Sequence, residues 1–242
     1  MAQRKFGAPR DVLRYEPSPR RVRARLGGAT VVDSYRPLLV WPPGWRAAIY
    51  AVPVDDVDPE ALRPADRTRA GAAETWDVVA DGRGAAAAAW RYEDPDLVDH
   101  LVLDVPAFDV WLEEEEELRF YPQDPFHRVD VRPSSRHVAV DVGGTRIADS
   151  SRIAILFETG LPLRAYLPPE DVRMDLLQPS DTRSKCPYKG EASYWSATAG
   201  GTTVPDVAWT YADPTPESER VRGLVAFWPG RAEVRIDGEL ID

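Results

Sequence analysis

A thiol, a phenol and an amine fall within four residues in the segment Cys186-Pro187-Tyr188-Lys189. Cys186 is the only cysteine of the 242-residue chain. A thiolate held by a nearby positive charge can act as a nucleophile, and a lysine can bind an anion as a point charge. Pro187 and Gly190 predict a turn that would bring Lys189 back over the sulfur. The alternative is a buried cysteine that packs as a small apolar side chain, beside a surface lysine.

A cysteine nucleophile usually works with a histidine. The three histidines, His100, His127 and His137, are scattered without metal-ligand spacing, and only His137 falls in the second of the two copies described below. A single cysteine allows no internal disulfide and no thiol-based zinc site. We therefore expect no metal site, and the sequence points to no particular cofactor.

Two carboxylates alternate with an arginine in Asp171, Arg173 and Asp175. They share one face in an extended chain, and the two aspartates also share one in a helical turn. Such a pair could hold Mg²⁺ or do acid–base work. We favour the simpler interpretation, a salt-bridged strip on the surface, and keep all three residues as candidate ligand contacts.

The aromatic residues of the same region offer a binding surface. Tyr194 and Trp195 are neighbours and must point to opposite faces of a strand, whereas Trp209 and Tyr211 share a face. Aromatic residues of small β-domains usually build the core. The other face can line a cleft, with Tyr188 beside it, and clefts with aromatic walls and few polar groups bind small molecules.

The elements that must position these residues are arranged as two copies of one domain. Leu26-Gly27-Gly28 recurs as Val142-Gly143-Gly144, at an offset of 116 residues (Gly143 minus Gly27). Tyr50 is expected to match Tyr166 at the same offset. A period of this length indicates a duplicated domain, because solenoid repeats are shorter.

The second half of the repeat has an offset of 119 residues (Trp209 minus Trp90), so the first copy is shorter in between. Where the second copy has residues 181–190, the first has only 66–71. Cys186 and Lys189 thus have no counterpart, and the first copy is degenerate. The predicted organisation is an N-terminal arm at 1–14, a first β-domain at 15–117, a linker at 118–130 and a second β-domain at 131–242.

The secondary structure is predicted to be mainly β. Alternating runs around glycine pairs predict hairpins over 21–32 and 136–148, and a last hairpin is expected to join 224–228 to 232–236 around Pro229-Gly230. Short strands, frequent turn signals and 23 prolines disfavour long helices. Short helical turns are predicted at Pro59–Leu62 and Pro216–Val221. The acidic run Glu113–Glu117 falls where the second copy has its last strand, so we expect it to end the first domain.

Composition restricts the partners. A net charge of −10 argues against nucleic acid and against an anionic membrane surface. No window approaches the length of a membrane helix, and the N-terminus lacks the apolar run of a secretory signal. We expect a cytoplasmic protein; the sequence does not indicate an oligomeric state.

The segments Asp171–Leu177, Cys186-Pro187-Tyr188-Lys189-Gly190, Ser193-Tyr194-Trp195 and Ala208–Tyr211 resemble domain-of-unknown-function family 427. The resemblance covers nearly all of 124–242 and, more weakly, 15–117. It implies small antiparallel β-domains of the Mss4-like or β-tent-like type, in which an aromatic-lined cleft binds a small ligand. The family is sometimes labelled a nucleotidyltransferase. Such an enzyme would show a Gly-Ser turn followed by an Asp-x-Asp pair in an α/β fold, whereas Gly143-Gly144 lies in a hairpin and not before a helix.

Three functions are compatible with these observations. The favoured one is a small-molecule-binding module with an aromatic-lined pocket in the second domain, near Cys186 and Lys189. The alternatives are an enzyme that uses Cys186 as a nucleophile or redox thiol with Lys189 as activator, and an interaction protein in which the motif is only a turn.

Overall fold

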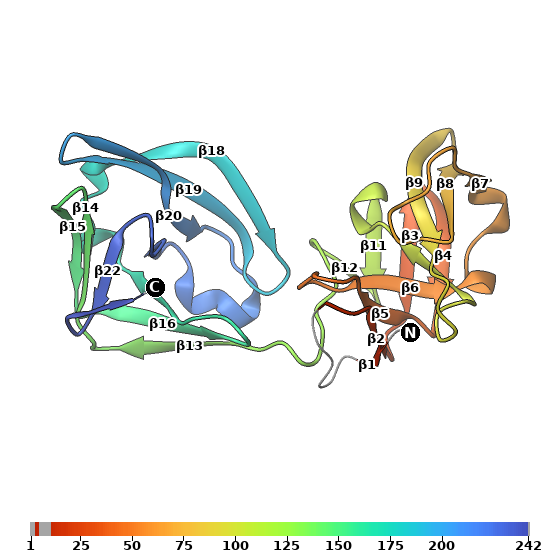
Figure 1. Cartoon of the computed structure of the whole chain (residues 1–242), viewed down its shortest axis with the longest axis horizontal. Helices are drawn as coiled ribbons and strands as arrows, with labels where there is room; N and C mark the ends of the chain where they lie inside the picture. The colour runs from red at the N-terminus through yellow and green to blue at the C-terminus, as the bar shows by residue number, and fades with distance from the viewer. Residues whose placement is uncertain (1–2, 5–10, 242) are drawn as a thin grey trace. The chain divides into compact units, whose positions relative to one another are not determined.

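The computed structural model describes residues 3–4 and 11–241, which divide into two compact units, Met1–Phe126 and His127–Asp242. Each unit consists of a larger and a smaller β-sheet joined by short 3-10 turns (Figure 1). Apart from the short parallel pair β1–β2, the ladders between the strands are antiparallel. The predicted fold class, two similar and mainly β domains with few short helices, is confirmed.

The first unit has a sheet of eight strands and a sheet of four. The larger runs in the order β1 (Gln3–Arg4), β2 (Arg14–Pro17), β5 (Leu38–Trp41), β6 (Ile49–Pro53), β10 (His100–Leu103), β9 (Arg83–Arg91), β8 (Glu74–Ala80) and β7 (Leu62–Pro64). The smaller runs β12 (Glu116–Glu117), β11 (Val110–Glu113), β3 (Val22–Leu26) and β4 (Ala29–Ser34). The 3-10 turns are η1 (Val54–Asp56), η2 (Pro59–Ala61) and η3 (Val105–Ala107).

The second unit repeats this plan. Its seven-stranded sheet runs β13 (Val129–Ser134), β16 (Ile153–Glu158), β17 (Arg164–Leu167), β21 (Val225–Phe227), β20 (Thr202–Tyr211), β19 (Gly190–Ala199) and β18 (Leu177–Cys186). Its four-stranded sheet runs β15 (Thr145–Ser150), β14 (Val138–Val142), β22 (Glu233–Ile236) and β23 (Glu239–Ile241). The turns are η4 (Pro169–Asp171), η5 (Met174–Leu176) and η6 (Pro216–Val221). From β2 and β13 onward, both units have the same strand order.

Irregularities in the ladders recur at matching places. A register shift between Ala24 and Arg25 has its counterpart between Val140 and Asp141. A second shift follows Trp76 in β8 and Trp195 in β19. Because a bulge bends a strand and re-aims its side chains, the two units share their curvature as well as their order.

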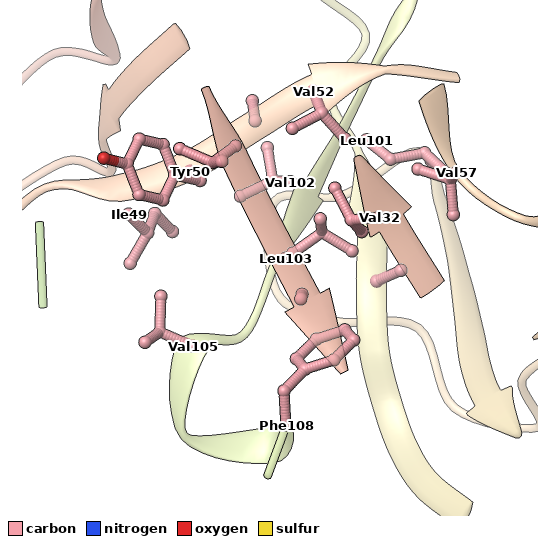
Figure 2. Packing of buried hydrophobic residues seen from close by; sticks show 14 of the residues in the cluster. Val32, Ile49, Tyr50, Val52, Val57, Leu101, Val102, Leu103, Val105 and Phe108 are labelled. Carbon is pink, nitrogen blue, oxygen red and sulfur yellow. The ribbon is translucent and has the colours of Figure 1, made fainter. Parts of the chain in front are cut away.

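The buried apolar residues are distributed differently in the two units. In the first unit they form one cluster, which includes Val32, Val102 and Leu103 (Figure 2). In the second unit they form two clusters on opposite faces of the seven-stranded sheet: Ala165 and Leu167 belong to one, and Tyr166 between them belongs to the other. This alternation follows from the pleat of the strand. The second unit therefore has a second face of the seven-stranded sheet that is covered by buried apolar and aromatic side chains.

The strand register corrects one expected match. Ala51 pairs with Leu38 and Val102, as Tyr166 pairs with Ala154 and Ala226. Ala51 therefore occupies the place of Tyr166, and the match of Tyr50 with Tyr166 is wrong by one residue. The connection between the two strands is one residue longer in the first unit, and a slip of one residue turns a side chain to the opposite face.

Tyr50 accordingly points toward the smaller sheet of its own unit. Its ring stacks on Trp111 with centroids 5.6 Å apart, and its hydroxyl donates to Glu113 Oε1 at 2.6 Å. The first unit therefore has no tyrosine at the place of Tyr166.

The last predicted hairpin is wrong. β21 pairs with β17 and β20 in the seven-stranded sheet, and β22 pairs with β14 and β23 in the four-stranded sheet. The two segments are joined by an isolated bridge between Pro229 and Ala232 and by the Ala232 amide, which donates to the Trp228 carbonyl at 2.9 Å. The local turn signal at Pro229-Gly230 was correct, but the chain uses it to change sheets. The helical turns beginning at Pro59 and Pro216 are confirmed.

The segments between and before the domains hold more structure than expected. Within the predicted arm, residues 1–2 and 5–10 lie outside the described residues, β1 pairs with β2, and Arg14 is buried in β2. Within the predicted linker, Leu118 and Tyr121 pack against the first core, and β13 begins at Val129. The acidic run forms the end of β11 and β12, which correspond to β22 and β23. Among the described residues, no helix is long and apolar enough to cross a membrane.

Candidate functional site

The Cys186–Lys189 segment forms the turn between β18 and β19. The Lys189 amide donates to the Cys186 carbonyl at 3.3 Å, which closes a β-turn with Pro187 at its second position. Gly190 follows with a φ of 103°, and a Cβ there would lie 2.8 Å from the Asp213 carbonyl oxygen. The predicted turn is therefore present, and the glycine is required by both its conformation and its packing.

The start of η6 holds this turn in place. The hydroxyls of Thr215 and Ser218 donate to the Tyr188 carbonyl at 2.6 and 2.9 Å, and all of these groups are buried. The Thr215 amide also donates to the Lys189 carbonyl at 3.3 Å. Because the backbone on both sides of Lys189 is bonded, the direction of its side chain is set by the fold.

The Lys189 ammonium makes an ion pair with the Glu158 carboxylate at the end of β16. The two side chains are only 14% and 7% exposed. The other Glu158 oxygen lies 3.0 Å from His127 Nε2, and the His127 ring stacks on Tyr188 with centroids 4.1 Å apart. A lysine, a carboxylate and a histidine thus form one chain of contacts beside the turn.

Of the four residues Lys189, Glu158, His127 and Tyr188, the sequence analysis did not select His127 and Glu158. It assigned His127 to the linker and stated that the second copy has no histidine beyond His137, whereas His127 lies in the second unit. It did not consider Glu158, which ends a strand of apolar residues. A carboxylate directly after such a run was the available signal.

The electrostatics of Glu158 follow from these contacts. Burial by itself would raise the pKa of this carboxyl, but the hydrogen bond with His127 and the charge of Lys189 outweigh it, so the pKa lies below its ordinary value. Glu158 is therefore ionised at neutral pH, and its charge is neutralised by groups of the same unit.

The Cys186 sulfur lies in the same surroundings. Burial raises the pKa of the thiol above its ordinary value, and the opposing charge of Lys189 does not overcome this effect. The sulfur is therefore protonated at neutral pH. Since the thiolate is the reactive form, this environment is typical of a structural or wall cysteine rather than of an activated nucleophile.

An aromatic face lines the same side of the seven-stranded sheet. Trp209 Nε1 donates to the Tyr166 hydroxyl at 3.2 Å, and the two rings meet edge to face with centroids 6.2 Å apart. The ring centroids of Trp228 and Trp209 are 5.1 Å apart, and Trp228 is partly accessible to solvent, with 38% of the residue exposed. We use the term aromatic face for the side chains of Arg164, Tyr166, Tyr194, Trp209, Tyr211 and Trp228.

The predicted aromatic residues divide as the strand pleat requires. Tyr194 lies opposite Trp209 in the β19–β20 ladder, and its hydroxyl is 2.8 Å from the Ser184 hydroxyl. Tyr211 is buried, and burial is the first cause of its raised pKa; Tyr166 and Cys186 lie close enough to add to it. Trp195 packs instead against the core between the two sheets. It does not belong to the aromatic face.

The Asp171–Asp175 strip has a different role. Asp171 accepts from the Ser150 hydroxyl and from Arg152, both at 2.6 Å, while Arg173 pairs with Asp175 at 2.7 Å. Among the described residues, none of the hydrogen bonds or ion pairs of these three residues reaches the aromatic face. No group of three or more His, Cys, Asp or Glu side chains in the described part of the chain is arranged to hold a metal ion.

The same aspartate contacts occur in the first unit. The Ser34 hydroxyl donates to Asp56 at 2.7 Å, and Arg36 pairs with Asp56 at 3.3 Å. A feature that both units share, although only one carries the cysteine motif, belongs to the fold. The contacts of Asp171 are thus those of a structural residue.

The lined face of the second unit is changed in the first at almost every polar position. The strand register gives the counterparts of four residues of this face, Glu158, Arg164, Tyr166 and Trp228, and none of the counterparts can make the same contacts. In the same order, the counterparts in the first unit are Pro42, Ile49, Ala51 and Asp104. Only the indole and phenol of the Trp-x-Tyr pair are kept, as Trp90 and Tyr92 in the first unit and as Trp209 and Tyr211 in the second.

In the first unit, the side chain of Arg69 occupies the region that corresponds to the aromatic face. The Arg69 guanidinium lies 4.0 Å over the Trp90 ring, pairs with Asp104 at 3.1 Å and donates to the Ala87 carbonyl. Arg69 comes from the short segment that replaces the Cys-Pro-Tyr-Lys-Gly turn. The first unit therefore presents no equivalent of the candidate site.

A groove of about 870 Å³ is instead found on another part of the first unit. It runs between the start of β10 and the turns after β4 and β6, and its walls include Tyr35, Arg36, Asp55 and His100. None of the residues that the sequence analysis selected lines it.

A family model described as a domain of unknown function, DUF427, matches the chain twice, over residues 14–113 and 130–238. The chain belongs to the DUF427 family. Two successive matches confirm the tandem duplication, and together they span most of both units. A comparison with curated proteins found no match.

Each DUF427 copy contains one larger and one smaller sheet. The second copy carries the turn, the ion pair and the open aromatic face, and the first carries Arg69 in their place. The family description names no activity, so a function must be argued from these contacts.

Proposed function

We propose that the second DUF427 unit is a small-molecule-binding module whose ligand contacts the aromatic face. The observation that carries the proposal is the buried chain Lys189–Glu158–His127 beside Tyr166, Trp209 and Trp228, present in one of two copies of the same fold. In the first unit Arg69 covers the corresponding indole, and we assign that unit no ligand site of this kind.

The energetics support this assignment. A buried ion pair is a weak source of stability, because removing two charges from water costs about as much as their attraction returns. The first unit reaches the same strand order with an apolar Pro42 and Ala51 at the corresponding places. Polar groups that the fold does not need, set beside a part-exposed tryptophan, are the usual elements of a ligand site.

An enzyme that uses Cys186 as a nucleophile is supported less well. Burial raises the pKa of the thiol, although Lys189 is near. A nucleotidyltransferase is also supported less well, since Asp171 and Asp175 are each bound to an arginine. The acidic composition agrees with a cytoplasmic protein that does not bind nucleic acid.

A thermal-shift screen with a set of small aromatic compounds of different charge tests the proposal. Some compounds should raise the midpoint of unfolding of the wild-type protein and have little effect on a Trp228→Ala variant. The matched control is Trp45→Ala, because Trp45 is a tryptophan of the first unit with a similar exposure of 40%. Stabilisation that survives Trp228→Ala and is lost in Trp45→Ala would contradict the proposal.

A further inference from the structure

Arg164, at the start of β17, is a half-buried cation without a carboxylate partner. Its Nη1 donates to the neighbouring Leu163 carbonyl at 3.1 Å, and this is the one hydrogen bond of its guanidinium among the described residues. No acid lies within ion-pair distance of it in the described part of the chain. By contrast, Arg152 and Arg222 of this unit each pair with a carboxylate.

The nearest acid does not supply the missing charge. Glu158 lies close enough to influence Arg164, but its two oxygens are taken by Lys189 and His127. Of the groups that face Arg164, the Tyr166 hydroxyl is protonated at neutral pH because burial raises its pKa. The face therefore carries one uncompensated positive charge. Burial lowers the pKa of Arg164, but a guanidinium remains charged at neutral pH.

The guanidinium also lies beside an aromatic ring. Its central carbon lies 5.8 Å from the centre of the Trp228 ring. An arginine restrained on a ring presents a planar fork of donors, which matches the two oxygens of a carboxylate. Beside it, the exposed part of Trp228 offers an apolar surface on which a flat group can lie.

The first unit lacks both parts of this arrangement. Ile49 stands at the place of Arg164, and Asp104 at the place of Trp228. There the unit's own arginine is neutralised by Asp104, so no charge is left over.

We infer that the ligand of the second unit is a small planar carboxylate, bound through its oxygens by Arg164 and through its flat group by Trp228. This inference rests on the proposed function and adds the chemical class of the ligand. Arg164 is then the residue that selects an anion over a neutral or cationic compound of the same shape.

The test uses three probes of one shape and different charge: benzoate, benzamide and benzylamine. Each is titrated into the full-length, ¹⁵N-labelled protein while the indole N–H signals of Trp228 and Trp209 are followed by NMR. Benzoate should bind at least about tenfold more tightly than benzamide, the difference expected for a charge-assisted pair of hydrogen bonds. Benzylamine should bind most weakly.

Two variants and a control assign the preference. Arg164→Met should remove the advantage of benzoate over benzamide, and Arg164→Lys should keep part of it, because charge remains but the planar fork is lost. Arg36→Met removes an exposed arginine of the first unit and should change nothing. An unchanged spectrum away from the site, and an unchanged unfolding midpoint, show that the variants are folded.

The possible results distinguish a failure of the carboxylate inference from a failure of the proposed small-molecule site. Equal affinities for benzoate and benzamide at Trp228, or a benzoate preference that survives Arg164→Met, would overturn the inference and leave a small-molecule site in place. If none of the three probes shifts either indole signal, both the inference and the proposed function are contradicted.

Discussion

Lys189 and Glu158 make an ion pair across the curl of the seven-stranded sheet. Lys189 follows the turn after β18, at one edge of the sheet, and Glu158 ends β16, near the other edge; β17, β21, β20 and β19 lie between. In Figure 1, β18 and β19 form one wall of this unit and β13 and β16 the opposite wall. The pair therefore joins the two walls beside the aromatic face.

Removing the lysine should destabilise the second unit. Lys189→Met leaves the buried Glu158 carboxylate with only His127 as a partner, and removing one partner of a buried ion pair costs about 3 kcal/mol or more. Denaturant unfolding followed by tryptophan fluorescence measures the loss. The control is Arg173→Met, which breaks the exposed pair with Asp175 and should have little effect. Equal effects of the two variants would mean that the Lys189 pair contributes no more than a surface contact.

The pKa of Glu158 predicts a loss of stability in acid. Its folded-state pKa lies below the unfolded value of about 4.5, so protons bind more tightly to the unfolded chain. The stabilisation is present above about pH 4.5 and is lost as the pH falls through the folded pKa. The free energy of unfolding, measured against pH, should fall more steeply for the wild type than for Glu158→Gln. Parallel curves would show that Glu158 has no depressed pKa.

The alkylation rate of Cys186 tests the enzyme alternative. Because burial raises the pKa of the thiol, labelling by iodoacetamide should be slow at neutral pH and should increase only above about pH 8.5, the ordinary value for cysteine. Mass spectrometry gives the rate without ambiguity, since there is one cysteine. Lys189→Met should move the midpoint further up. Fast labelling with a midpoint well below 7 would support a nucleophilic Cys186 instead.

Arg69 should be important for the stability of the first unit. Its guanidinium stacks on Trp90 and pairs with Asp104, and both charged side chains are about 30% exposed. Arg69→Leu should cost about 1–2 kcal/mol, the sum expected for a cation–π contact and a part-exposed ion pair. Arg67→Leu, an exposed arginine of the same segment, is the control. If Arg69→Leu left the free energy of unfolding unchanged, the contacts of Arg69 with Trp90 and Asp104 would not stabilise the first unit.

Much of the fold could be predicted because its signals are local. The glycine pairs at Gly27-Gly28 and Gly143-Gly144 define hairpins by their own conformation, and both glycines of each pair have a positive φ. The same holds for the turn at Cys186–Lys189. Repetition of these signals at a constant offset was enough to predict two similar β-domains.

The rest depends on contacts between distant parts of the chain. A turn signal at Pro229-Gly230 does not say whether the next strand returns to the same sheet, and here it does not. A one-residue difference in the β5–β6 connection turned Tyr50 away from the place of Tyr166. Local patterns cannot detect such a slip when both faces of a strand are apolar.

The candidate site shows the same division. Cys186, Tyr188 and Lys189 were predicted from a compact motif, and Tyr194, Trp209 and Tyr211 from alternation. Glu158 and His127 were missed because they approach the motif only when the sheet curls. Asp171 and Asp175 were selected by spacing alone, and the structure gives each a separate arginine partner.

A crystal structure of the protein soaked with benzoate would locate the ligand site in one unit or the other. We predict bound benzoate in the second unit, with its ring against Trp228 and its carboxylate at Arg164, and no molecule over Trp90, where Arg69 lies. Benzoate bound only in the groove of the first unit beside Tyr35 and His100 would contradict the account, because the function would then belong to the other copy.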